Sequence, residues 1–172
     1  MSSPASEDLE SQTLLLVEEH VRRLLVRLDF EQATVRCHRL TEEVSSDTSS
    51  YPTIEINIEA GDTGKLLIGS QGSHLQALQH IIRTLLRRQL SQPARIVVDV
   101  NGYRVKREQV LLSLAEDSAR RAQSSGRNIV LRPMEAAERR MIHTALATHQ
   151  EVSTESMGDE PNRRVVIRPN LI

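Results

Sequence analysis

The chain has 172 residues, enough for one domain or for two small ones, and its 38% hydrophobic and 26% charged residues are typical of a globular protein. It contains no run of about 18 apolar residues that could span a bilayer, and its start lacks the basic and apolar segments of a signal peptide. The single cysteine, Cys37, excludes an internal disulfide, and three aromatic residues without Trp are too few for a row of base-stacking rings. We therefore expect a cytoplasmic protein without membrane insertion.

The net charge of −1 conceals an asymmetry between the two parts of the chain. Residues 1–60 carry 5 Lys and Arg against 12 Asp and Glu, whereas residues 61–172 carry 17 against 11. Such a difference predicts a region that binds a polyanion, placed beside a region that does not. Ordinary surface charge that happens to be segregated is the alternative interpretation.

The first part of the chain predicts one helix and two strands after a Ser-rich, disordered start at residues 1–8. Leu9–Phe30 has the apolar spacing of an amphipathic helix of about six turns. Ala33–Leu40 and Thr53–Glu59 alternate as strands do. The acidic, Ser-rich segment Thr41–Pro52 between them is predicted to be a hairpin loop.

A Gly-x-x-Gly sequence, Gly69-Ser70-Gln71-Gly72, comes directly before a helical pattern that ends near Leu90. Glycines bring the backbone close to another molecule, and the unpaired N–H groups and positive dipole end of the following helix suit a phosphate. A plain turn before a helix is the alternative interpretation. Arg95–Val100 then predicts a strand, closed by the turn dipeptide Asn101-Gly102.

A second unit of helices and strands follows. Arg104–Ser125 is predicted to be a helix that Gly126 terminates, and Asn128–Leu131 a short strand. Pro133 is predicted to open another helix, which continues to about His149. Two last strands are predicted at 151–157 and 163–168, joined by a turn at 158–162.

Arg139 and His143 lie four residues apart, so a helix projects both from one face. An arginine fork suits phosphate oxygens, and a neighbouring histidine can donate a hydrogen bond or lie against a base. A solvated helix face with a satisfied histidine is the alternative. Other basic residues favour a continuous basic patch: Arg140 beside the pair, Lys106 and Arg107 on the preceding helix, Arg164 and Arg168 on one face of the last strand, and Arg163 on its other face.

The sequence gives no support for catalysis, a metal or a cofactor. His74 and His80 are six residues apart, as are His143 and His149, and no cysteine or carboxylate completes a metal-ligand pattern. No nucleophile elbow, phosphate-binding P-loop or paired carboxylate motif is present. Cys37 lies in a predicted strand and is interpreted as a small core residue. We therefore expect a protein that is not an enzyme.

Two stretches carry a resemblance to known domains. The order of elements, together with Leu67–Gly72 and the following Leu75 to Gln79, resembles a type II KH domain with its GxxG turn. Arg132–His143 together with Glu160–Pro169 resembles the single-stranded nucleic-acid-binding domain named for its Arg-x-x-x-His signature. A KH domain followed directly by that domain is the layout of the bacterial Jag family, which the chain resembles over about residues 9–169.

The resemblance implies an α+β fold: a type II KH domain of α-β-β-α-β order at residues 9–102, then a small α/β Arg-x-x-x-His domain at 103–169. It also implies RNA binding in the cytoplasm. Some family members pair with a small single-KH protein and influence cell elongation and envelope synthesis. Two departures stand out: Ser70 and Gln71 occupy positions where RNA-gripping KH turns usually have a basic residue, and nothing before Leu9 could form the N-terminal domain found in many members.

The resulting hypothesis is a non-catalytic protein that binds single-stranded RNA, or single-stranded DNA. The predicted contact residues are Gly69, Ser70, Gln71, Gly72, Arg139, Arg140, His143, Arg164 and Arg168. The alternative is an adaptor whose KH domain pairs with a small KH protein, or with a second copy of the chain, and for which nucleic-acid binding is secondary.

Overall fold

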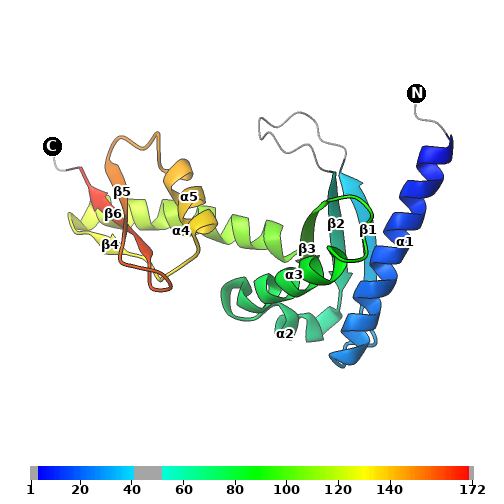
Figure 1. The fold of residues 1–172 in the computed structure, drawn as a ribbon. Helices are drawn as coiled ribbons and strands as arrows, with labels where there is room; N and C mark the ends of the chain where they lie inside the picture. Colours follow the sequence, from blue (N-terminus) through cyan, green and yellow to red (C-terminus); the bar gives the residue numbers. More distant parts are fainter. Residues whose placement is uncertain (1–3, 41–51, 171–172) are drawn as a thin grey trace. The chain divides into compact units, whose positions relative to one another are not determined.

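The computed structural model describes residues 4–40 and 52–170. The chain divides into two compact units, Met1–Tyr103 and Arg104–Ile172, and each has its own sheet and apolar core (Figure 1). Helices and strands are mixed in both units, so the predicted α+β class is confirmed. The predicted loop Thr41–Pro52 lies outside the described residues except for Pro52.

The first unit contains a three-stranded sheet of order β1-β2-β3. β1 (Thr34–Leu40) runs antiparallel to β2 (Thr53–Glu59), and β3 (Arg95–Val100) runs parallel to β2. The predicted bounds of β2 and β3 are confirmed, and β1 begins one residue later than predicted. Because side chains alternate along a strand, β2 sends its three isoleucines into the core: Ile54, Ile56 and Ile58.

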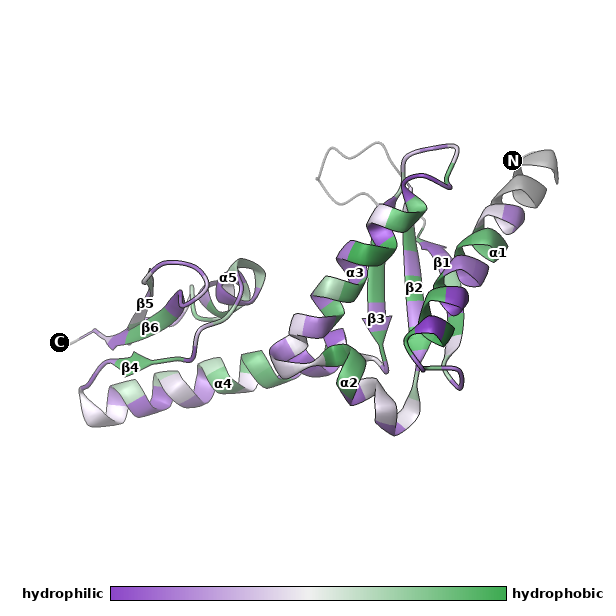
Figure 2. Cartoon of the chain, turned by 60° about the horizontal axis from the view of Figure 1, so that its bottom comes forward, coloured by the Kyte–Doolittle hydropathy of each residue, from purple (hydrophilic) through white to green (hydrophobic). Residues whose placement is uncertain are grey.

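Two helices cover the apolar face of this sheet, α1 (Pro4–Arg27) over β1 and α3 (Ser73–Leu86) over β3 (Figure 2). α1 begins at Pro4, inside the stretch predicted to be disordered, and ends before Asp29, whose left-handed φ of +64° breaks the helix. The buried residues recur every three or four positions on both helices: Val17, Val21 and Leu25 on α1, and Leu75, Leu78, Ile82 and Leu86 on α3.

Helix side chains bond both edges of the first sheet. The backbone N–H of Cys37, on edge strand β1, donates to Oε1 of Glu18 on α1 at 2.8 Å. On the opposite edge, the N–H of Val98 on β3 donates to Oε1 of Gln79 on α3 at 3.1 Å. An edge strand leaves alternate N–H groups unpaired, and these two helices satisfy one on each side. Cys37 itself is buried in the core.

The connection from β2 to β3 consists of short helical pieces. η1 (Gly61–Thr63) and α2 (Gly64–Ile68) come first, and η2 (Ser70–Gly72) leads into α3. The side chain of Asn101, just after β3, forms two hydrogen bonds with the start of this connection. Its Oδ1 accepts a hydrogen bond from the N–H of Ala60 at 2.9 Å, and its Nδ2 donates one to the carbonyl of Gly61 at 2.7 Å. The start of the connection that leads to the Gly-x-x-Gly turn is thus fixed to the end of β3.

The second unit packs two helices against a three-stranded antiparallel sheet of order β4-β6-β5. The elements are α4 (Tyr103–Ser125), β4 (Ile129–Val130), α5 (Ala136–Ala145), β5 (Val152–Met157) and β6 (Arg164–Pro169). Small residues on α4, including Ala115, Ala119 and Ala122, allow it to lie close to the sheet, where Val165 and Ile167 are fully buried.

The prediction that Pro133 opens a helix is wrong. Residues 131–135 form neither helix nor strand, Glu135 is extended, and the helix begins only at Ala136 and ends at Ala145 rather than near His149. Instead, the N–H of Leu131 donates to the carbonyl of Val165 at 2.9 Å, and the N–H of Met134 donates to that of Arg163 at 3.1 Å. Pairing with the start of β6 therefore overrides the local helix signal.

Among the described residues, no helix has both the length and the apolar composition that crossing a bilayer requires. The described part of the chain also contains no group of three or more His, Cys, Asp or Glu side chains arranged to hold a metal ion.

Candidate nucleic-acid interface

The Gly-x-x-Gly sequence forms a left-handed turn between α2 and α3. The φ angles are +70° at Gly69, +54° at Gln71 and +86° at Gly72, in the region that glycine adopts most readily. Ser70 and Gln71 are exposed, whereas Gly72 is buried. The turn therefore presents two uncharged polar side chains to solvent, and only part of its glycine backbone.

Both glycines make room for side chains of the chain itself. A Cβ atom on Gly69 would lie 2.4 Å from Cγ of His74, and one on Gly72 would lie 2.9 Å from Cε1 of Tyr103. These separations are far below van der Waals contact. Internal packing is therefore sufficient to explain why glycine occupies both positions.

His74 is a residue of this turn that the sequence pattern did not single out for binding. Its Nδ1 lies 2.7 Å from the carbonyl oxygen of Leu66 and must donate, because a carbonyl only accepts. The ring is exposed and packs against Gly69. Its position two residues after the second glycine was the available signal, since that places it in the first turn of α3.

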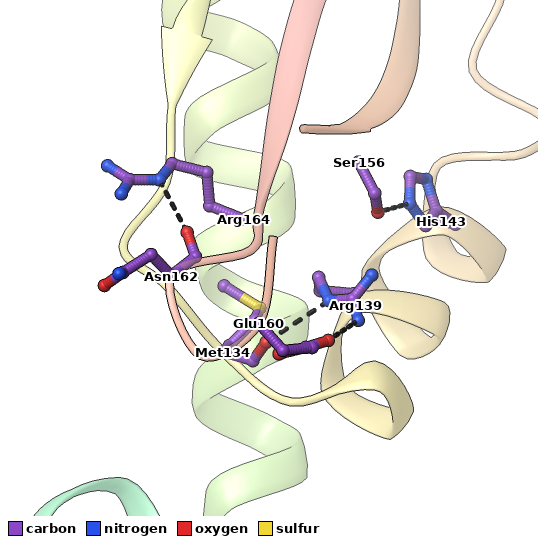
Figure 3. Close-up of polar contacts among 7 residues, drawn as sticks. All are labelled: Met134, Arg139, His143, Ser156, Glu160, Asn162 and Arg164. Atoms are coloured by element: carbon purple, nitrogen blue, oxygen red, sulfur yellow. Dashed lines mark hydrogen bonds and ion pairs between the residues drawn. The ribbon is translucent and has the colours of Figure 1, made fainter. Parts of the chain in front are cut away.

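In the second unit, Arg139 is in the interior. Only 7% of its surface is exposed, so the expectation that it lies open for a nucleic-acid strand is wrong. Its Nε donates to the carbonyl of Met134 at 3.2 Å, and its NH2 group donates to Oε1 of Glu160 at 2.5 Å (Figure 3). The guanidinium thus connects the start of α5 to the loop between β5 and β6.

His143 is half-buried and engaged on both ring nitrogens. Nδ1 lies 2.7 Å from Oγ1 of Thr154, and Nε2 lies 2.8 Å from Oγ of Ser156. Burial lowers the pKa of His143 below its ordinary value of 6.5, and the positive charge of Arg139 lowers this pKa further. The ring is therefore neutral at pH 7 and fixes β5 to α5.

Acidic side chains interrupt the basic patch that the sequence predicted. Arg107 donates two hydrogen bonds to Glu138, from Nε to Oε1 at 2.7 Å and from NH2 to Oε2 at 3.1 Å. Glu135 precedes α5 close by, and its pKa is raised first by burial and then by the charge of Glu138. The carboxyl groups of Glu135 and Glu138 therefore lie among the arginines at the start of α5, so the basic patch is not continuous there.

The predicted residues of the second unit do not share one surface. Thr154 and Ser156 turn toward His143 on the helix side of β5, so Glu155 between them points to the other face. Arg168 donates to Glu155 at 2.6 Å and therefore lies on that other face. Arg164 lies on the same face of β6 as Arg168, as alternation predicted, and extends away from Arg139 (Figure 3).

Of the contact residues predicted in the second unit, Arg140, Arg164 and Arg168 keep exposed surface. Arg140 is exposed on α5. Arg168 is exposed and Arg164 is partly exposed on the outer sheet face, and Arg164 donates its Nε to the carbonyl of Asn162 at 3.1 Å. Exposed guanidinium groups of this kind bind phosphate oxygens, whereas Arg139 and His143 hold the framework together.

Comparison with known proteins finds one family model within the second unit and relatives that align over much of the chain. The family model of the Arg-x-x-x-His (R-three-H) domain matches residues 109–169. The RNA-binding protein KhpB of Bacillus subtilis is 34% identical over 154 residues, which cover 84% of this chain and 73% of that protein. KhpB of Clostridium symbiosum is 35% identical over 114 residues, covering 66% of this chain and 51% of the relative. KhpB of Lactiplantibacillus plantarum is 34% identical over 140 residues, covering 81% of this chain and 42% of the relative.

These matches define a protein with an R-three-H domain in its C-terminal unit. The chain belongs to the KhpB family, which is the Jag family that its sequence resembles. It spans about half the length of the Clostridium and Lactiplantibacillus relatives.

Proposed function

We propose that this chain binds single-stranded RNA in the cytoplasm and catalyses no reaction. Membership of a family whose relatives are named RNA-binding proteins is the observation that carries this proposal. The exposed arginines of the second unit supply the positive charge that a nucleic-acid backbone requires.

We further propose that the first unit is a type II KH domain that contacts RNA at its Gly-x-x-Gly turn. The sheet, the two helices on one face and the left-handed turn before α3 support this assignment. The contact side chains are Ser70 and Gln71 at the tip, with Lys65 one turn earlier on α2. Lys65 pairs with Asp62 at 3.9 Å, but both side chains are solvated, so this pair competes weakly with a phosphate.

Fluorescence anisotropy of the full chain with a labelled single-stranded RNA tests the proposal, with a duplex RNA and a single-stranded DNA of the same length as comparisons. We expect binding that prefers the single strand and weakens with salt. The logarithm of affinity should fall by about 0.7 per phosphate contact for each logarithmic unit of salt. Failure to bind single-stranded RNA at low salt would contradict the proposal.

Substitutions at the turn should change the exposed side chains rather than the glycines. Ser70→Asp places a negative charge at the tip without disturbing the packing of His74 or Tyr103, whereas any residue at Gly69 or Gly72 disturbs it. We expect Ser70→Asp to weaken RNA binding several-fold at unchanged stability. Ser113→Asp, at an exposed position on α4, is the matched control and should leave binding nearly unchanged.

An adaptor that pairs through its KH unit is a second candidate function. The uncharged Ser70 and Gln71 favour it, and so does Ile81 on α3, an isoleucine that is 47% exposed. The partner would be a small single-KH protein or a second copy of the chain. Sedimentation of the purified chain, alone and with such a partner, tests this function: Ile81→Glu should abolish pairing, and pairing that survives Ile81→Glu would exclude this face.

The resemblance to the Jag family also motivates a proposed role in gene regulation linked to cell elongation and envelope synthesis. Deleting the gene should change cell length, and the Ser70→Asp variant should fail to restore it if RNA binding is the relevant activity. Full restoration by that variant would separate the cellular role from the turn.

A further inference from the structure

The outer face of the second sheet has an apolar centre of its own. Val165 and Ile167 point into the core of the unit, so Val166 between them points to the opposite side of β6. Val166 is nevertheless only 4% exposed. Its cross-strand neighbours on that side are Val130 of β4 and Glu155 of β5. The side chains around Val166 therefore cover it and form a continuous outer surface.

Two basic side chains lie on this surface, and the NH2 group of Arg168 reaches back across it to Sδ of Met157 at 3.8 Å. Arg164 and Arg168 stand two positions on either side of Val166, about 13 Å apart along the strand at 3.3 Å per residue. Exposed apolar side chains lie beside them: Met157 is the cross-strand partner of Arg164, and Val130 is exposed at the other edge. The surface thus combines two cations with two exposed apolar side chains.

Neither arginine is committed to an internal role. Among the described residues, Arg164 has one hydrogen bond, from Nε to the carbonyl of Asn162, which leaves its terminal nitrogens open. Arg168 pairs with Glu155, but the two side chains are 44% and 58% exposed, so water already competes for both. Glu155 is the carboxylate that faces these arginines across the strands.

We propose that single-stranded RNA lies across this outer sheet face, with its phosphates on Arg164 and Arg168 and its sugars and bases on Val130 and Met157. Glu155 then limits affinity, because its carboxylate competes with a phosphate for Arg168. Guanidinium planes offer stacking surfaces for unpaired bases where aromatic rings are missing. This inference rests on the proposed RNA binding and assigns it to the face opposite Arg139 and His143.

The test uses anisotropy of a labelled twelve-nucleotide polyuridine with the full chain at fixed salt. The double variant Arg164→Gln, Arg168→Gln should bind at least tenfold more weakly and lose about 1.4 from the logarithmic salt slope, the loss expected for two phosphate contacts. Glu155→Gln should bind about three- to tenfold more tightly. A gain of affinity keeps the proposal testable if the double variant folds poorly.

A second ion pair in the same unit provides matched controls. Arg120 and Asp117 pair on α4 between two exposed side chains, as Arg168 and Glu155 do on the sheet. Asp117→Asn changes the net charge as Glu155→Gln does, and Arg120→Gln matches a single arginine loss; both should leave affinity within twofold. If the wild-type chain binds RNA and substitutions at the two ion pairs change its affinity equally, the sheet-face assignment is wrong. The proposed RNA binding itself would not be contradicted by that result. A wild-type chain that does not bind polyuridine or any other single-stranded RNA would remove both.

Discussion

Arg139 donates a hydrogen bond to Glu160 across 21 residues of sequence, from the first turn of α5 to the β5–β6 loop. The arginine is almost fully buried, whereas 59% of the Glu160 side chain is exposed. A buried charge that loses its partner is costly, and a solvated carboxylate that loses its partner is rehydrated. The pair therefore acts as a structural tie whose essential member is the arginine.

Arg139→Ala should destabilise the second unit by about 2–4 kcal/mol, because it removes a buried side chain and leaves the carbonyl of Met134 without its donor. Arg139→Lys should fall between the alanine variant and the wild type, since an ammonium cannot reproduce the two-sided contact of the planar fork. Urea denaturation followed by circular dichroism measures both effects.

RNA affinity separates this structural role from direct recognition. The folded Arg139→Lys chain should bind single-stranded RNA within about twofold of wild type. A large loss of affinity in this variant without a loss of stability would show that Arg139 reaches the ligand after all.

His143 should make stability depend on pH. Its pKa is lowered in the folded chain from an ordinary value of 6.5, so as pH falls the unfolded chain takes up the proton first. Stability from this group is therefore present above pH 6.5 and is lost as pH falls from 6.5 toward the folded-state pKa. His143→Gln keeps a hydrogen-bonding side chain but does not titrate, so the variant should show a flatter dependence.

Denaturation of wild type and His143→Gln at several pH values between 5 and 8 measures this difference. Glu135 contributes with the opposite sign, because its raised pKa makes stability fall as pH rises above 4.5. Taking the difference between the two chains cancels the Glu135 effect. A pH dependence identical in both chains would show that His143 is not the responsible group.

Alanine at Gly69 should cost more stability than alanine at Gly61. Both glycines have positive φ, +70° and +52°, so each substitution carries a conformational penalty of about 1 kcal/mol or more, and the penalty is larger at Gly69, whose ψ of −172° lies in a region essentially restricted to glycine. A Cβ on Gly61 meets no atom within 4 Å, whereas one on Gly69 collides with the ring of His74. Thermal denaturation of the two variants therefore measures the combined cost of the collision and of the backbone conformation at Gly69.

Removing the ring should relieve that cost. We expect the double variant Gly69→Ala, His74→Ala to be less destabilised than the sum of the two single variants. Strict additivity would mean that the ring moves aside freely and that Gly69 is not needed for internal packing.

Cys37 should resist thiol reagents in the folded chain. Burial raises the pKa of its thiol to about 12, and the nearby charge of Glu18 contributes to this rise, so almost no thiolate exists at pH 8. Reaction with a coloured disulfide reagent should be negligible until denaturant unfolds the first unit, and then complete. Glu18→Gln removes the smaller cause only and should leave the native thiol slow to react. Rapid labelling without denaturant would contradict the buried position.

Local sequence patterns were sufficient to predict the helices and strands that bury one regular apolar face. Alternation over Thr53–Glu59 and the three-and-four spacing in α3 predicted the correct structures, because each pattern corresponds to one buried face. Alternation also placed Arg164 and Arg168 on one face of β6.

The errors came from contacts between distant residues. Pro133 is a good first residue for a helix, yet the backbone next to it pairs with Arg163. Arg139 has a helical position typical of a solvated arginine, yet the β5–β6 hairpin brings Glu160 to it. Neither partner can be identified from spacing, since each depends on how a later hairpin folds back.

The bonds from Glu18 to β1 and from Gln79 to β3 have a consequence for self-assembly. A strand from another molecule that approached either border of the first sheet would meet a donor already occupied at Cys37 or Val98, and would have to displace a helix side chain to extend the ladder. The first unit is thereby protected against growing into a continuous intermolecular sheet.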